Sequence, residues 1–177
     1  MYLIVLFSLC EIMSCIPHSV KESINVRLGS SYKPSHPLLK HSEDGAYFQI
    51  SNDTITPHCF MAFSNDGVVS CGTLYNYTYN AVYSIENDSI YVQFINWWYP
   101  GFPIKSYSAA KVGCKILNDS TIQYTYMAGS QTYTRTYIFQ ATNRPINVTS
   151  TDDMRNYSWM WKSRKERRAW KMANRRK

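Results

Sequence analysis

The residues of this chain that could do chemistry are its cysteines, its histidines and its fifteen tyrosines. The histidines show no metal-ligand spacing to one another or to a cysteine. His58 adjoins Cys59, but neighbouring residues on a strand point to opposite faces, so the two cannot readily share a proton as a nucleophile and its base must. Phosphate-binding loops, dinucleotide fingerprints and nucleophile elbows do not occur in the sequence. We therefore expect no enzymatic activity, no cofactor and no metal site.

The tyrosines lie mostly in strand-like runs, where they alternate with polar residues such as threonine. In a small β-barrel such residues fill the interior. If the barrel is hollow, the same tyrosines line a pocket, and their hydroxyl groups give it polar selectivity. The candidate ligand-binding tyrosines are Tyr83, Tyr91, Tyr124, Tyr126, Tyr133 and Tyr137.

Residues 96–103 form a second aromatic group, Asn-Trp-Trp-Tyr-Pro-Gly-Phe-Pro. We interpret this stretch as a long loop between two strands. As a lid or rim over a cavity, or as an anchor for a partner protein, it adds Trp97 and Trp98 to the candidate site. The alternative is a plug that closes one end of the barrel.

The elements that must position these side chains are β-strands. Runs rich in Tyr, Ile, Val, Thr and Phe are separated by turn clusters, among them Asn52-Asp53, Asn87-Asp88 and Asn118-Asp119. Period-two alternation in several runs indicates antiparallel strands with one buried face. Eight strands are predicted, at residues 46–51, 54–63, 68–75, 77–85, 89–97, 107–116, 120–127 and 131–140. Because the connections are short, we predict a mainly β fold, an up-and-down meander that closes into a barrel.

The predicted barrel domain, residues 45–149, lies between a lead-in and a C-terminal segment. The lead-in, residues 16–44, reads as irregular, with one helical turn expected near Leu38–His41. In residues 150–177, the sequence Ser-Thr-Asp-Asp at 150–153 is typical of a helix N-terminus, since side-chain oxygens accept its free backbone N–H groups. One helix is predicted over residues 152–172.

The cysteines predict a cross-strand bridge. A hairpin that turns at Asn65–Gly67 brings Cys59 and Cys71 nearly opposite each other, so a disulfide between them is our first choice. Cys114 then pairs with Cys15 or stays free. Other pairings remain open, because connectivity cannot be derived from sequence.

Export is indicated by two independent features. Residues 2–10 are an apolar run too short to span a bilayer, so residues 1–15 are predicted to be a signal peptide, with a buried strand or a lipoprotein signal as alternatives. No later segment has the length and apolarity of a membrane span. Six Asn-x-Ser/Thr sequons then predict N-glycosylation of a secreted protein, at Asn52, Asn76, Asn87, Asn118, Asn147 and Asn156.

Nearly all the excess charge lies at the C-terminal end. Residues 155–177 hold ten basic residues and one acid, while the rest of the chain holds nine basic and eleven acidic residues. Such a tail could bind sulfated glycans or anionic surfaces, bind nucleic acid, direct nuclear import, be removed by a convertase, or be a solvated end. The candidate polyanion-binding residues are Lys162, Arg164, Lys165, Arg167, Arg168, Lys171, Arg175, Arg176 and Lys177.

The order of these features resembles the lipocalin-like (calycin) barrels. Gly45-Ala46-Tyr47 stands where that family has Gly-x-Trp, and Arg144 or Arg135 stands where it has a basic residue after the last strand. The family's Thr-Asp-x-x-Tyr motif is not recognisable here. The resemblance implies a secreted carrier of small apolar or amine ligands, a function that fold alone does not establish.

We therefore expect a secreted, glycosylated binding protein that sequesters a small ligand or docks an extracellular partner protein, with a basic tail for anionic surfaces. The alternative is a β-sandwich of immunoglobulin type that acts as an interaction or decoy module without a cavity. The cysteine spacings and the sequential hairpins both disfavour that alternative.

Overall fold

The computed structural model describes residues 18–29, 32–52, 54–72, 78–101, 104–128, 130–142 and 154–174. Two compact units divide the chain, one formed by Met1–Asn25 with Phe94–Ala110 and the other by Val26–Gln93 with Lys111–Lys177. The first contains the short helix α2 (His18–Glu22), the end of β5 and the beginning of β6. The site described below lies in the second unit.

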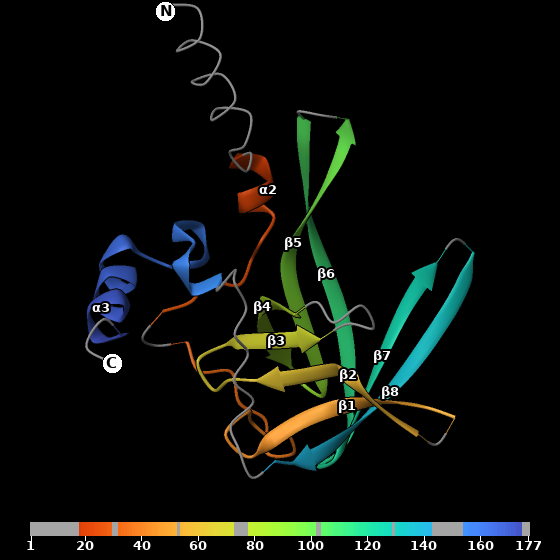
Figure 1. Cartoon of the computed structure of the whole chain (residues 1–177). Coiled ribbons are helices and arrows are strands. Elements are labelled where there is room, and N and C mark those ends of the chain that lie inside the picture. Colours follow the sequence, from red (N-terminus) through yellow and green to blue (C-terminus); the bar gives the residue numbers. More distant parts are fainter. Residues whose placement is uncertain are drawn as a thin grey trace, which may run out of the picture. The chain divides into compact units, whose positions relative to one another are not determined.

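Eight antiparallel strands form a closed barrel in which each strand pairs with its neighbour in sequence and β1 pairs with β8 (Figure 1). The strands are β1 (Gly45–Ser51), β2 (Thr54–Phe63), β3 (Val68–Gly72), β4 (Thr78–Glu86), β5 (Ser89–Gly101), β6 (Ile104–Asn118), β7 (Thr121–Ala128) and β8 (Gln131–Ala141). The predicted meander and its closure are therefore confirmed. The β-sandwich alternative is wrong.

The turn residues explain why the strands end where they do. Asn52 and Asn87 adopt positive φ angles of 50° and 53°, a conformation that asparagine tolerates better than most residues. Gly67 has a φ of 90°, and a Cβ atom there would lie 2.5 Å from the Tyr32 ring. This turn therefore requires glycine for both conformation and space.

One end of the barrel interior is filled by aromatic rings. Phe63 makes edge contacts with Tyr47 and Tyr83, at centroid distances of 5.8 and 5.1 Å. Tyr47 also contacts Phe139 edge-on at 5.3 Å, which ties β1 to β8. Edge-to-face packing is favoured by the ring quadrupoles, so these rings form a solid core.

The other end opens toward a two-stranded ribbon. β7 and β8 pair along their length, up to Ala128 opposite Gln131. In contrast, the described pairing of β6 with β7 stops at Cys114, and that of β1 with β8 stops at Ile50 opposite Thr136. The pairing of β7 with β8 therefore continues beyond the described pairing of either strand with its other neighbour (Figure 1).

The C-terminal segment is joined to the lead-in by backbone hydrogen bonds. The Leu28 N–H donates to the Met160 carbonyl, and the Lys162 N–H donates to the Leu28 carbonyl, both at 2.7 Å. Leu28 and Trp161 thereby form an isolated parallel β-bridge. Leu28 and Met160 are buried, so this segment is part of the fold.

The predicted C-terminal helix is confirmed, but it spans Arg164–Asn174, and the prediction of one continuous helix over residues 152–172 is wrong. The described residues contain the 3-10 turns η1 (Met154–Asn156) and η2 (Ser158–Met160), and the helix α3 (Arg164–Asn174) follows them. The bridge to Leu28 holds Trp161 extended, and α3 begins after Ser163, whose hydroxyl accepts the Glu166 N–H at 3.2 Å. The helical turn expected near Leu38–His41 is also wrong, because Leu38 lies in a non-helical turn and residues 39–41 are irregular; the lead-in instead contains α2.

The interpretation of residues 96–103 as a loop is corrected as well. The β5 strand continues through Trp97 and Trp98 to Gly101, and β6 begins at Ile104. Trp and Tyr have high β propensity, and Pro100 lies near the strand end, where a missing N–H is tolerated. The side chains of Trp97 and Trp98 lie outside the described residues.

Candidate functional site

Arg135 lies on the inner face of the barrel, at the row where the β7–β8 ribbon begins. In the β7–β8 register Tyr124 is opposite Arg135, Tyr126 is opposite Tyr133, and Ile122 is opposite Tyr137. Opposed residues of antiparallel strands share a face. Ile122 and Tyr137 are 0% and 5% exposed, which identifies this face as the interior.

The Arg135 guanidinium is held by tyrosines. Its Nη2 atom donates a hydrogen bond to the Tyr126 hydroxyl at 3.0 Å, and the guanidinium carbon lies 4.9 Å from the centroid of the same ring. Arg135 also hydrogen-bonds the Tyr137 hydroxyl. These contacts restrict the planar cation to a position between the two tyrosines.

Three tyrosine rings form a stack beside this cation. Tyr124 and Tyr126 lie with centroids 5.3 Å apart and planes 18° apart, and Tyr126 and Tyr133 lie 5.4 Å and 21° apart. Tyr133, at the outer end of the stack, is 42% exposed. The stack therefore extends from an exposed ring, Tyr133, to Tyr126, the ring that Arg135 contacts.

The electrostatics of the site favour an anion. Burial lowers the Arg135 pKa and is the largest single influence on it, but the hydroxyls of Tyr126 and Tyr137 outweigh burial and raise that pKa, so the group stays charged. Burial raises the pKa of Tyr137, an effect that Arg135 opposes. Among the described residues, Arg135 makes no ion pair with a carboxylate. The site thus has a fixed positive charge and neutral hydroxyl groups.

The predicted disulfide between Cys59 and Cys71 is absent, and Cys59, Cys71 and Cys114 are all buried thiols. Cys71 lies opposite Met61, two residues from Cys59. Diagonal neighbours of this kind lie roughly 7–8 Å apart with Cβ atoms somewhat closer, which exceeds the Cβ separation of about 3.5–4.5 Å in a disulfide. Burial raises the pKa of Cys114 to about 12 and that of Cys59 above its usual value, although Arg135 lowers the latter. Cys59 and Cys114 therefore stay protonated and unreactive at neutral pH.

The structure brings four of the candidate tyrosines together around Arg135, namely Tyr124, Tyr126, Tyr133 and Tyr137. Tyr83 is apart from them, fully buried among the core rings, and its hydroxyl donates to the Ser64 carbonyl at 2.8 Å. Tyr91 lies on the outer face, one residue from the inward Val92, and its ring is covered by the Lys111 ammonium at 4.0 Å. The candidate site therefore belongs to β7 and β8.

Arg135 itself was not among the candidate ligand-binding residues, although its position in the period-two pattern of β8 could have identified it. It lies two residues from both Tyr133 and Tyr137, so the period-two pattern that places those rings inside places Arg135 inside too. Its charge makes an inward position unexpected, because arginine is rarely found in a barrel interior without a partner.

The described sequons lie at the surface. Asn52, Asn87, Asn118 and Asn156 are exposed. Asn76, Asn147, the predicted signal peptide at residues 1–15 and the tail residues Arg175, Arg176 and Lys177 lie outside the described residues.

A separate groove of about 1170 Å³ lies between the lead-in, the β2–β3 turn and α3. Trp161, Trp170, Tyr32 and three lysines are among the residues that line it. Of the predicted polyanion-binding residues, Lys162 and Lys165 line the groove, whereas Arg164 and Arg168 lie on α3 outside the groove lining.

Within the described ranges, no helix has the length and apolarity needed to cross a membrane. The same residues contain no cluster of three or more histidine, cysteine or acidic side chains arranged to hold a metal ion. Comparison with known proteins gives no match: no protein-family model, no curated protein and no solved structure is similar to this chain.

Proposed function

We propose that this chain is a secreted, glycosylated binding protein whose barrel holds a small anionic ligand with an aromatic or apolar body. Arg135 binds the anionic group, and the stack of Tyr124, Tyr126 and Tyr133 receives the flat body of the ligand. The observation that carries the proposal is the half-buried Arg135 guanidinium, which hydrogen-bonds tyrosine hydroxyls and has no carboxylate partner among the described residues.

The energetic reason lies in the cost of a half-buried charge. A guanidinium withdrawn from water loses hydration, and neutral hydroxyl groups replace only part of it. A carboxylate or sulfonate from a ligand forms charge-assisted hydrogen bonds to the planar donor set, in the bidentate geometry that arginine favours. The site therefore prefers anions to neutral molecules of the same shape.

This assignment narrows the ligand class implied by the lipocalin-like resemblance. That resemblance includes carriers of amines, but a cationic amine would be repelled by Arg135. A closed barrel of eight sequential strands is compatible with such a carrier. Because a barrel fold alone establishes neither ancestry nor function, membership of the lipocalin-like family is part of the proposal.

The test compares two ligands of one shape, 2-naphthoate and its neutral amide, 2-naphthamide, binding to the full chain by titration calorimetry. We expect the carboxylate to bind at least about tenfold more tightly than the amide. The Arg135→Gln variant should bind both equally. Equal affinities in the unaltered protein, or a preference that survives Arg135→Gln, would exclude the proposed role of Arg135.

A matched control is Lys115→Gln, which removes one positive charge from the outer face of the barrel. Lys115 is exposed and lies opposite Gln123, one position out of phase with the inward pair of Cys114 and Tyr124. This variant should keep the preference for the carboxylate. A loss equal to that of Arg135→Gln would mean that net charge, and not the site, attracts the ligand.

Export and glycosylation have their own test. The exposure of Asn52, Asn87, Asn118 and Asn156 supports them, because a glycan needs an accessible asparagine. When the chain is expressed with residues 1–15 in a eukaryotic secretory host, the protein in the medium should lose mass on enzymatic deglycosylation. Retention in the cells, or an unchanged mass, would exclude this part of the proposal.

A further inference from the structure

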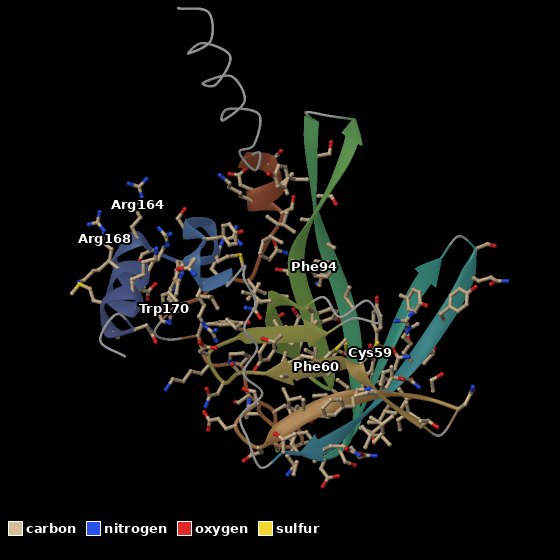
Figure 2. All side chains as sticks on the ribbon, viewed as in Figure 1. Cys59, Phe60, Phe94, Arg164, Arg168 and Trp170 are labelled. Atoms are coloured by element: carbon tan, nitrogen blue, oxygen red, sulfur yellow. The ribbon has the colours of Figure 1, made fainter. Side chains whose placement is uncertain are left out.

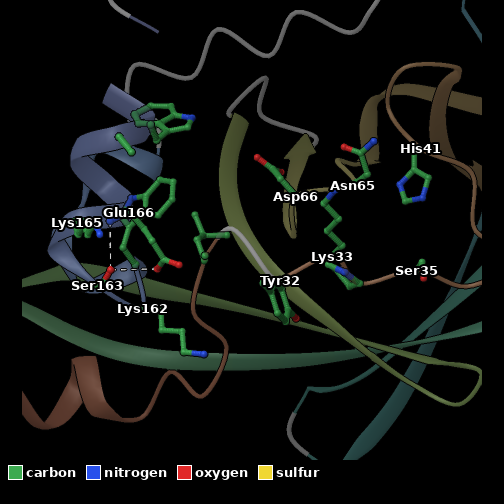
Figure 3. Close-up of a pocket in the computed structure, with 16 residues that line it drawn as sticks. Tyr32, Lys33, Ser35, His41, Asn65, Asp66, Lys162, Ser163, Lys165 and Glu166 are labelled. Carbon is green, nitrogen blue, oxygen red and sulfur yellow. Dashed lines mark hydrogen bonds between the residues drawn. The ribbon is translucent and has the colours of Figure 1, made fainter. Parts of the chain in front are cut away.

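The groove beside α3 is formed by three segments that are far apart in the sequence. The lead-in contributes Tyr32 and Lys33, the β2–β3 turn contributes Asp66, and the C-terminal segment contributes Trp161 and Trp170. Figure 3 shows lysines on opposite sides of this groove, with Lys33 on the lead-in and Lys162 and Lys165 on the C-terminal segment. The groove is separate from the Arg135 site and has its own charge.

The acidic residues of the groove, Asp66 and Glu166, make hydrogen bonds within the protein, whereas its described lysines make no ion pair. Arg155 donates to both carboxylate oxygens of Asp66, at 3.2 and 3.3 Å. Glu166 accepts from the Ser163 hydroxyl at 3.2 Å, at the N-terminus of α3. Among the described residues, Lys33, Lys162 and Lys165 make no ion pair. The groove therefore presents three cations to a ligand.

Fixed aromatic rings accompany these cations. The Trp161 and Trp170 rings lie 5.7 Å apart with planes 41° apart, and the Trp161 Nε1–H donates to the Arg155 carbonyl at 2.7 Å. The Tyr32 hydroxyl donates to the Tyr83 carbonyl, which anchors this ring to β4. The Leu28–Trp161 bridge holds the two walls together. The aromatic surface is thus formed before any ligand arrives, which lowers the entropic cost of binding.

We propose that this groove binds a segment of a sulfated polysaccharide, with sugar rings against the indoles and sulfate groups on the lysines. Lysines on opposite walls suit a ligand that carries anionic groups at several positions along its length. Arg164 and Arg168 project from the other side of α3 (Figure 2), where they extend the positive field beyond the groove. This site is independent of the anionic-ligand site at Arg135.

The experiment compares two double variants that lose the same charge. Lys33→Gln with Lys162→Gln removes two groove cations, and Arg164→Gln with Arg168→Gln removes two from the outer side of α3. Affinity for a size-fractionated heparin oligosaccharide is measured by titration calorimetry on the full chain. We expect the groove variant to lose at least about tenfold and the outer variant to lose about threefold or less. Equal losses would overturn the groove site in favour of a diffuse charge effect.

Two further measurements test whether binding requires the sulfate groups of the ligand and the indole rings of the groove. Fully desulfated heparin should not bind, and Trp170→Phe, which keeps an aromatic ring of smaller area, should weaken heparin binding without altering the circular dichroism spectrum. Binding of ATP as tight as that of the oligosaccharide would overturn the polysaccharide assignment in favour of a nucleotide. Arg135→Gln should bind heparin normally, which separates a failure of this site from a failure of the barrel site.

Discussion

Arg135 donates a hydrogen bond to the Tyr126 hydroxyl and lies over the face of the same ring, so one tyrosine contacts this cation in two ways. The rings of Tyr124 and Tyr133 both stack with Tyr126, and these contacts restrict its movement. Arg135 is thereby held at the last row of the closed barrel. A flexible arginine would lose more side-chain entropy on binding an anion, so this relationship favours binding at the site.

The Tyr126→Phe variant tests this relationship. It keeps the ring and its stacking but removes the acceptor of the Arg135 hydrogen bond. Because the pair is only partly buried, we expect the free energy of unfolding to fall by about 1 kcal/mol, measured by urea denaturation. The control is Tyr133→Phe, whose hydroxyl bonds the exposed Gln131 and should change stability by less than about 0.5 kcal/mol. Equal effects of the two substitutions would contradict the argument.

Gly45 is expected to be essential for closure of the barrel. It lies opposite Ala141 in the β1–β8 pair, and a Cβ atom there would lie 2.1 Å from the Gln140 carbonyl oxygen. Because backbone must move to relieve this contact, Gly45→Ala should lower the free energy of unfolding by about 2 kcal/mol or more.

The matched control for Gly45 is Gly113→Ala, on β6. A Cβ atom at Gly113 would meet the Tyr91 ring at 3.8 Å, an ordinary contact. We expect this variant to be neutral or stabilised by up to about 1 kcal/mol, because glycine in a strand costs entropy. If Gly113→Ala destabilises the chain as much as Gly45→Ala does, the backbones of β1 and β8 are not unusually close at Gly45.

Much of the fold was predictable because its signals are local. Asn52 and the Asn-Asp clusters at residues 87–88 and 118–119 fall at the turns, and the period-two runs between them fall on strands. What could not be predicted depends on contacts between distant residues. The β-bridge to Leu28 breaks the predicted C-terminal helix at Trp161, and the β2–β3 register separates Cys59 from Cys71. The candidate tyrosines were identified only by their positions in the period-two pattern of the strands. The groove beside α3 could not be predicted in this way, because it is formed by three segments and no single segment indicates it.

The protein should lose stability between about pH 9 and about pH 12. Burial raises the pKa of Cys114 from 9.0 to about 12 and that of Tyr32 from 10.0 to about 12, and it also raises the pKa of Tyr83 and Tyr137. In this window the folded chain keeps protons that the unfolded chain releases, so rising pH favours unfolding. Below about pH 9 these groups are protonated in both states, so this loss does not occur.

Urea denaturation at several pH values measures this loss, and a thiol reagent at pH 8 should not modify Cys114 without denaturant. A free energy of unfolding that is constant up to pH 11 would contradict the burial of these groups. Rapid modification of all the thiols at pH 8 would do the same.

The C-terminal segment is expected to contribute directly to stability. Met160 is 0% exposed and its carbonyl accepts the Leu28 N–H, so Met160→Ala leaves a cavity beneath the bridge. We expect a loss of about 2–5 kcal/mol, measured by urea denaturation. Met172, on α3, is 65% exposed, and Met172→Ala should change stability by less than about 0.5 kcal/mol. If both variants are neutral, the segment does not pack as described, and the groove that depends on it is not preformed.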